Sequence, residues 1–153
     1  MITRSYPVAV SVLLKPVWFD RKPTGRIGID SLEDFILDQP TWFNFQLTSN
    51  KEIVKTLTIE YYDKNNQDTC IDTNKDTAIV VEEIKFNDIS SPKFAWQGIY
   101  QPEYPEHYRQ GKTLEPTLSP HTYLGWNGIW TLEFTLPIYT WIHKIENFGW
   151  IYD

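Results

Sequence analysis

The sequence predicts an all-β fold, a β-sandwich or jelly roll with a short C-terminal helix. Several short segments alternate apolar and polar residues, turn-forming residues separate them, and helices do not alternate with the strands as a parallel sheet would require. A chain of 153 residues suits one hydrophobic core, so we expect a single domain over residues 1–153.

The N-terminal half contains four segments with strand character, residues 8–14, 30–37, 42–47 and 53–62. The first has valine or leucine at every second position, which is typical of a strand with one buried face, and Pro16 makes it an edge or bent strand. The second also fits one helical turn, and we favour the strand. The last is rich in β-branched and aromatic residues, which favour strands.

The C-terminal half contains three regular segments, residues 78–86, 129–136 and 138–147. The first two alternate as strands do, and Asn87-Asp88 predicts a hairpin turn after the first. The third has apolar residues at helical spacing after Pro137, which predicts a short amphipathic helix, with a strand as the alternative. Between residues 90 and 128, prolines and glycines predict long connections with short strands near 94–99.

Composition excludes several classes of function. The formal net charge is −6 and no stretch concentrates Lys and Arg, so a nucleic acid is not an expected partner. The single Cys70 excludes an internal disulfide and a cysteine-rich zinc site. No apolar run approaches the roughly 20 residues needed to span a bilayer. We therefore expect a soluble protein of the cytoplasm or of a particle assembled there.

Catalytic motifs are absent from the sequence. It contains no GxSxG, no HExxH and no glycine-rich phosphate loop. Glu82 and Glu83 are adjacent on a predicted strand and should point to opposite faces, so they are not expected to flank one bond as glycosidase carboxylates do. These observations favour a binding domain over an enzyme.

Aromatic residues make up 16% of the chain, and many lie in the irregular region between residues 90 and 130. Rings on loops can stack on the apolar faces of sugars, and the same rings can also fill the rim of a core or anchor a protein interface. We predict that the ligand-binding residues are Trp96, Tyr100, Tyr104, Tyr108 and Trp126.

The polar loop after residue 63 contains part of a calcium-loop pattern. Its candidate ligands for calcium are Asp72, Asn74, Asp76 and Glu83, which match positions one, three, five and twelve. Thr77 stands where the pattern requires glycine, and a strand follows instead of a helix, so a solvated hairpin loop is the alternative. A looser calcium site would draw its ligands from Asp63, Asp68, Asp72 and Asp76.

Four stretches carry a family resemblance: TLTIEYYDK, the aspartate-bearing segment from Asp68 to Ile89, GIYQPEYP, and LGWNGIWTLEFTLPIYTWIHKIENFGWIYD. In this order they resemble small proteins of tailed bacteriophages, which are similar in pattern to β-sandwich carbohydrate-binding modules. The resemblance covers roughly Leu57 to Asp153 and transfers no ligand residue. It implies a jelly roll and either a virion component or a sugar-binding module.

The sequence therefore supports two hypotheses. The first is a non-catalytic binding or structural module of a phage particle, which contacts other particle proteins through its aromatic loops, forms an oligomer, and resides in the host cytoplasm or the virion. The alternative is a calcium-assisted carbohydrate-binding module.

Overall fold

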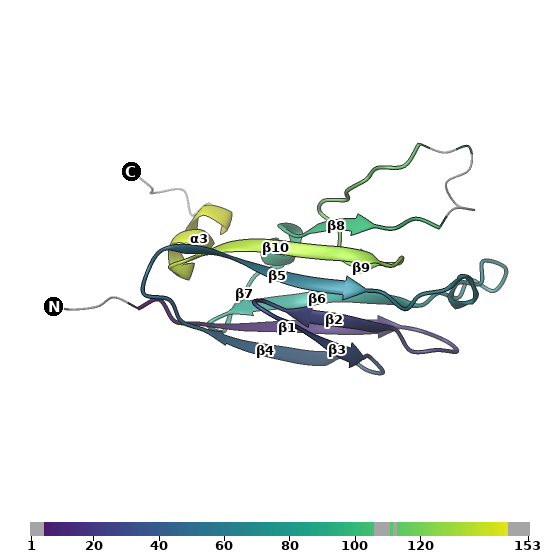
Figure 1. Cartoon of the computed structure of the whole chain (residues 1–153), viewed down its shortest axis with the longest axis horizontal. Coiled ribbons are helices and arrows are strands. Elements are labelled where there is room, and N and C mark those ends of the chain that lie inside the picture. The colour runs from purple at the N-terminus through teal and green to yellow at the C-terminus, as the bar shows by residue number, and fades with distance from the viewer. Residues whose placement is uncertain (1–4, 106–110, 112, 147–153) are drawn as a thin grey trace.

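Two antiparallel five-stranded sheets form the layers of the protein, described here from a computed structural model that covers residues 5–105, 111 and 113–146 (Figure 1). Sheet A has the order β4-β1-β6-β7, and β9 also pairs with β6. Its strands are β1 (Val8–Val17), β4 (Thr41–Leu47), β6 (Ala78–Phe86), β7 (Ile89–Ser90) and β9 (Tyr123–Leu124). Sheet B has the order β3-β2-β5-β10-β8. Its strands are β2 (Thr24–Gly28), β3 (Leu32–Ile36), β5 (Ile53–Tyr61), β8 (Ile99–Pro102) and β10 (Gly128–Leu136).

The predicted all-β sandwich is confirmed. Alternate residues of β1 and β10 are buried, as their sequence pattern predicts, and the buried side chains of both sheets form one apolar cluster. Trp130 is completely buried in this cluster, and its indole nitrogen donates to the carbonyl of His121 at 2.8 Å. The core therefore satisfies the polar atom of its largest side chain.

The helices in the described part of the chain are short. They are the 3-10 helix η1 (Asn66–Asp68), α1 (Pro92–Trp96) and α3 (Ile138–Glu146). The predicted C-terminal helix is confirmed, because α3 buries Ile138, Trp141 and Ile142 against the sandwich. The described residues form no helix long and apolar enough to cross a membrane.

The short strand predicted near residues 94–99 is wrong. Residues 92–96 form α1, which begins where the Ser91 side chain accepts a hydrogen bond from the Lys93 amide and Pro92 occupies the first turn. This serine-proline start is typical of a helix, and it turns Phe94 into the core. Strand pairing resumes only at Ile99.

Pro16 is predicted to make β1 an edge or bent strand, yet β1 lies between β4 and β6. The pairing with β4 ends at Leu14, so the side of Pro16 that faces away from β6 has no strand partner. A proline is tolerated in this central strand because its missing N–H is not needed there.

The prediction that Glu82 and Glu83 face opposite sides is also wrong. Leu13 pairs with Glu83 and Leu14 with Val81, which leaves Glu82 as the extra residue of a β-bulge. Val81 and Ile84 are buried on either side, and neither glutamate is buried. Both carboxylates therefore line the same groove on the outer surface of sheet A.

Candidate functional site

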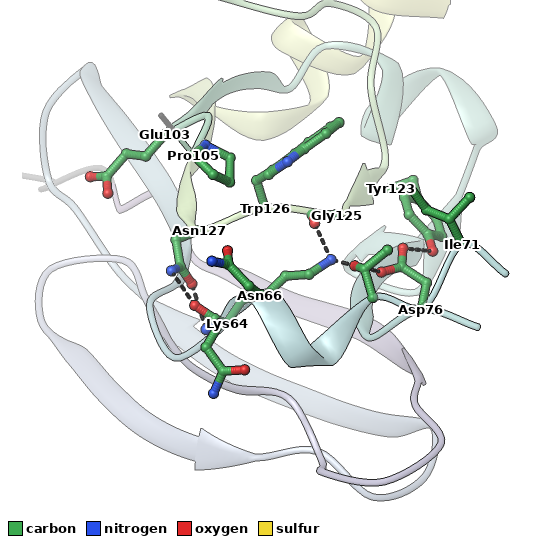
Figure 2. Close-up of a pocket in the computed structure, with 12 residues that line it drawn as sticks. Lys64, Asn66, Ile71, Asp76, Glu103, Pro105, Tyr123, Gly125, Trp126 and Asn127 are labelled. Atoms are coloured by element: carbon green, nitrogen blue, oxygen red, sulfur yellow. Dashed lines mark hydrogen bonds and ion pairs between the residues drawn. The ribbon is translucent and has the colours of Figure 1, made fainter. Parts of the chain in front are cut away.

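A pocket of about 220 Å³ lies at one end of the sandwich, where three connections meet (Figure 2). The connections are the β5–β6 loop that carries η1, the segment after β8, and the β9–β10 connection. The loop with η1 projects at the right-hand end of Figure 1. Residues far apart in the sequence therefore line one concave site.

Lys64 and Asp76 form an ion pair inside this pocket. The Lys64 ammonium donates to Asp76 Oδ1 at 2.7 Å and to the carbonyl oxygen of Gly125, and the Lys64 side chain is only 9% exposed. Thr69 Oγ1 donates to Asp76 Oδ1 at 2.6 Å, and the Tyr123 hydroxyl donates to Asp76 Oδ2 at 2.6 Å. Three side chains thus hold one carboxylate (Figure 2).

This arrangement moves the pKa values of two groups. Partial burial alone would raise the pKa of Asp76, but the hydrogen bonds from Lys64, Thr69 and Tyr123 outweigh it, so the pKa is lowered. Burial and the hydrogen bond to Asp76 raise the pKa of the Tyr123 hydroxyl. At neutral pH, Asp76 is therefore an ionised acceptor and Tyr123 a neutral donor.

A pH dependence of stability follows from the lowered pKa of Asp76. Its contribution is present above the unfolded-state pKa of about 3.9 and is lost as the pH falls through the lower folded-state pKa. We expect the difference in unfolding free energy between wild type and Asp76→Asn to be largest above about pH 5 and to shrink below about pH 4. Urea unfolding across this pH range measures it.

Asp88→Asn is the matched control, because Asp88 is exposed in the β6–β7 turn at φ 67°, a conformation that asparagine also adopts readily. It should follow the wild-type profile. An Asp76→Asn profile parallel to wild type at every pH would contradict the prediction.

Asn127 joins two of the three connections. Its side-chain oxygen accepts from the Lys64 amide at 2.7 Å, and its side-chain nitrogen donates to the Lys64 carbonyl at 2.9 Å. Its own carbonyl accepts from the Glu103 amide at 2.7 Å, which adds the third connection. Asn127 is thus a structural clamp of the pocket, because its amide group is already engaged by backbone.

Arg21 fixes the η1 loop to the body of the protein. Its guanidinium donates to Asp68 Oδ2 at 2.6 Å and to Asp63 Oδ2 at 2.8 Å, and the Asp68 side chain is 5% exposed. Asp68 also accepts from the Asn65 amide in the capping box of η1. The loop is therefore tied down on both sides of Asn65 and Asn66, which line the pocket.

Trp126 and Tyr123 are the aromatic residues among the described residues that line the pocket. The Trp126 ring contacts Tyr104 edge-on, with centroids 5.2 Å apart and planes at 69°, and the Tyr104 hydroxyl donates to the carbonyl of Glu115 at 3.1 Å. The Tyr100 hydroxyl is hydrogen-bonded to the Trp126 backbone. Tyr104 and Tyr100 therefore fix the position of Trp126.

No protein-family model and no curated protein matches the chain. Two solved structures are similar to it. One is the selenomethionine form of vCBM60, from work on calcium-dependent carbohydrate-binding modules, with a TM-score of 0.49 and 9% identity over 82% of this chain and 89% of that chain. The other is vCBM60 in complex with galactobiose, with a TM-score of 0.47 and 10% identity over 81% of this chain and 96% of that chain.

The structure separates the predicted ligand-binding residues. Trp126 lines the pocket and Tyr104 packs against it. Tyr100 is fully buried and cannot contact a ligand, so that prediction is corrected to a supporting role. Trp96 is 51% exposed in the separate groove that Glu82 and Glu83 line. Tyr108 lies outside the described residues.

The predicted calcium ligands do not come together. Asp76 lies in the pocket, whereas Asp72 and Asn74 are exposed in the turn between Cys70 and Lys75. Glu83 lies further along β6, about 16 Å from Ala78 in the strand direction at roughly 3.3 Å per residue. Its carboxylate accepts from Ser90 Oγ at 2.8 Å. Over the described ranges, no three His, Cys, Asp or Glu side chains form a group that could hold a metal ion.

Three aspartates of the looser calcium set are held by cationic side chains. Asp63 and Asp68 are paired with Arg21, and Asp76 is paired with Lys64. A calcium ion takes six to eight oxygen ligands. The three carboxylates are already engaged in neutralising the two cationic side chains Arg21 and Lys64. Lys64 is absent from the predicted site residues, because a single lysine after a strand has no distinctive pattern.

Proposed function

We propose that this protein is a non-catalytic carbohydrate-binding domain and that its site is the pocket of Lys64, Asp76, Tyr123 and Trp126. The observation that carries the proposal is the placement of a braced tryptophan ring beside a hydrogen-bonded charged pair in one pocket. A neutral sugar ring presents apolar C–H faces and hydroxyl groups to a protein. An aromatic ring suits the first, and oriented charged donors and acceptors suit the second.

The size of the pocket agrees with a small ligand. Its volume of about 220 Å³ is below the roughly 300 to 1,000 Å³ that is typical of sites for drug-sized ligands. A single sugar ring or the end of a glycan chain is therefore the expected occupant. The exposed Glu103 and Asn66 at the pocket add polar groups for further hydroxyls.

The state of Asp76 supports binding rather than hydrolysis. A glycosidase needs a carboxylic acid whose pKa is raised so that it can protonate the leaving group. Hydrogen bonds hold the pKa of Asp76 below its ordinary value, so at neutral pH this carboxylate accepts hydrogen bonds and does not serve as an acid.

A glycan array with wild type, Trp126→Ala and Trp96→Ala tests the proposal. We expect wild type to retain glycans and Trp126→Ala to lose affinity at least tenfold, equivalent to about 1.4 kcal/mol. Trp96→Ala removes an exposed tryptophan outside the pocket and should bind as wild type does. Circular dichroism establishes that each variant is folded.

Two outcomes would overturn the proposal. If wild type retains no glycan, the domain is not a carbohydrate-binding module. If Trp96→Ala loses binding and Trp126→Ala does not, the sugar site is the groove on sheet A and the pocket has been wrongly assigned.

The particle-component hypothesis remains a second candidate. The observation that favours it is the exposed Trp96, because tryptophan is enriched at protein interfaces. Size-exclusion chromatography with light scattering, alone and with candidate particle proteins, tests it. A monomer that associates with none of them would count against this function.

A further inference from the structure

The Lys64 ammonium lies among oxygen atoms of the kinds that usually surround a metal cation. Its acceptors are a carboxylate oxygen of Asp76 and the backbone carbonyl of Gly125, and the hydroxyls of Thr69 and Tyr123 complete the shell around the carboxylate. Carboxylates and carbonyls are the ligands that calcium prefers. In this pocket, the positive charge that balances them comes from the chain itself.

Lys64 and Asp76 both keep hydrogen-bonding capacity that these contacts do not use. A lysine ammonium has three N–H donors, and Lys64 uses two of them for acceptors within the described residues. A carboxylate has about four acceptor positions, and Asp76 receives three hydrogen bonds. Asp76 Oδ1 accepts from both Lys64 and Thr69, so the remaining acceptor position is on Oδ2, which accepts from Tyr123. One donor on Lys64 and one acceptor on Asp76 Oδ2 therefore remain, and both residues line the pocket.

We propose that Lys64 takes the place of a metal cation in this pocket, and that the Lys64–Asp76 pair binds two adjacent hydroxyls of a saccharide without a divalent ion. This inference rests on the proposed carbohydrate-binding function and names the groups that perform it. The ligand class is a sugar with an accessible vicinal diol. One hydroxyl accepts from the Lys64 ammonium, and its neighbour donates to Asp76.

Electrostatics exclude calcium while Lys64 is present. A divalent cation bound to Asp76 would lie a few ångströms from the ammonium, and like charges at this separation repel strongly in a partly buried site. Asp76 offers an ion only one acceptor position that Lys64, Thr69 and Tyr123 do not already occupy. The described pocket holds one other carboxylate, that of the exposed Glu103.

The first arm of the test uses calcium chloride alone. Thermal unfolding of wild type in millimolar calcium and in EDTA should give the same Tm, because no calcium site stabilises the folded state. A calcium-dependent rise in the Tm of wild type that Asp76→Asn abolishes would overturn the proposal. This arm needs no sugar, so it gives an answer even if the glycan array shows no binding.

The second arm uses the glycan array with and without EDTA. Wild type should retain the same glycans in both conditions, and Lys64→Met should lose affinity at least tenfold. Since Lys64→Met leaves the partly buried Asp76 without its counter-charge and can unfold the domain, Lys64→Met/Asp76→Asn is measured beside it. The double variant removes both charges, and it should fold and fail to retain glycans.

Two results in this arm would contradict the role of Lys64: loss of wild-type binding in EDTA, or wild-type affinity in the folded double variant. If wild type retains no glycan in either condition, the carbohydrate function fails, and the calcium arm still decides whether Lys64 excludes a metal from the pocket.

Discussion

Trp130→Ala is expected to lower the free energy of unfolding by about 3 to 5 kcal/mol. Trp130, near the start of β10, is completely buried, and its indole nitrogen donates to the carbonyl of His121. A Cβ atom on Gly98 would lie 1.9 Å from the ring, so this glycine leaves the space that the indole fills. Alanine would open a large cavity and leave the His121 carbonyl without its donor.

Urea unfolding with Tyr104→Ala as the control measures this effect. Tyr104 is only partly buried and lies in the connection after β8, so its loss should spare folding and instead loosen Trp126. An unfolding free energy of Trp130→Ala equal to that of wild type would mean that the indole does not fill the core.

Arg21→Met is expected to lower the free energy of unfolding by roughly 2 to 3 kcal/mol. The Asp68 carboxylate is 5% exposed, and without Arg21 it would remain buried with its charge unpaired. Arg21 itself is 40% exposed, so solvent screening keeps the effect below the roughly 3 to 5 kcal/mol of a wholly buried pair. Because Asp68 belongs to the capping box of η1, whose loop lines the pocket, the same variant should also weaken the proposed glycan binding.

The double variant Arg21→Met/Asp68→Asn distinguishes two causes of the lost stability: the unpaired charge of Asp68 and the lost packing of the Arg21 side chain. Removing both charges should recover part of the stability, so the double variant should be more stable than the sum of the two single losses predicts. Strictly additive losses in urea unfolding would show that Arg21 and Asp68 do not stabilise the loop through each other.

The strands could be predicted because their pattern is local. Alternation in β1, β5, β6 and β10 reports which face is buried, and these strands appear where the sequence indicates them. The bulge at Glu82 could not be predicted in this way. It depends on how β6 aligns with β1, roughly seventy residues earlier in the chain, and one extra residue puts two adjacent carboxylates on the same face.

The site was predictable only in part for the same reason. Trp126 and Asp76 are conspicuous as residue types, but their partners come from distant segments: Lys64 contacts Gly125, and Tyr123 contacts Asp76. Tyr100 shows the opposite error, because a tyrosine between turns resembles a loop residue although it pairs with Trp130 in sheet B and is buried. Residue type indicates chemistry, whereas exposure depends on the packing of the whole chain.

Lys64 follows a strand of sheet B, and Asp76 precedes a strand of sheet A, so their ion pair closes the loop through which the chain crosses between layers. For the proposed carbohydrate-binding function, this means that the fold itself holds Lys64 and Asp76 in place and that they need no rearrangement when a glycan binds. Such rigidity spares the complex much of the entropic cost of ordering side chains. The proposed affinity would also depend on how the two sheets are packed. A shift of one sheet against the other would separate the Lys64 ammonium from the Asp76 carboxylate and weaken sugar binding.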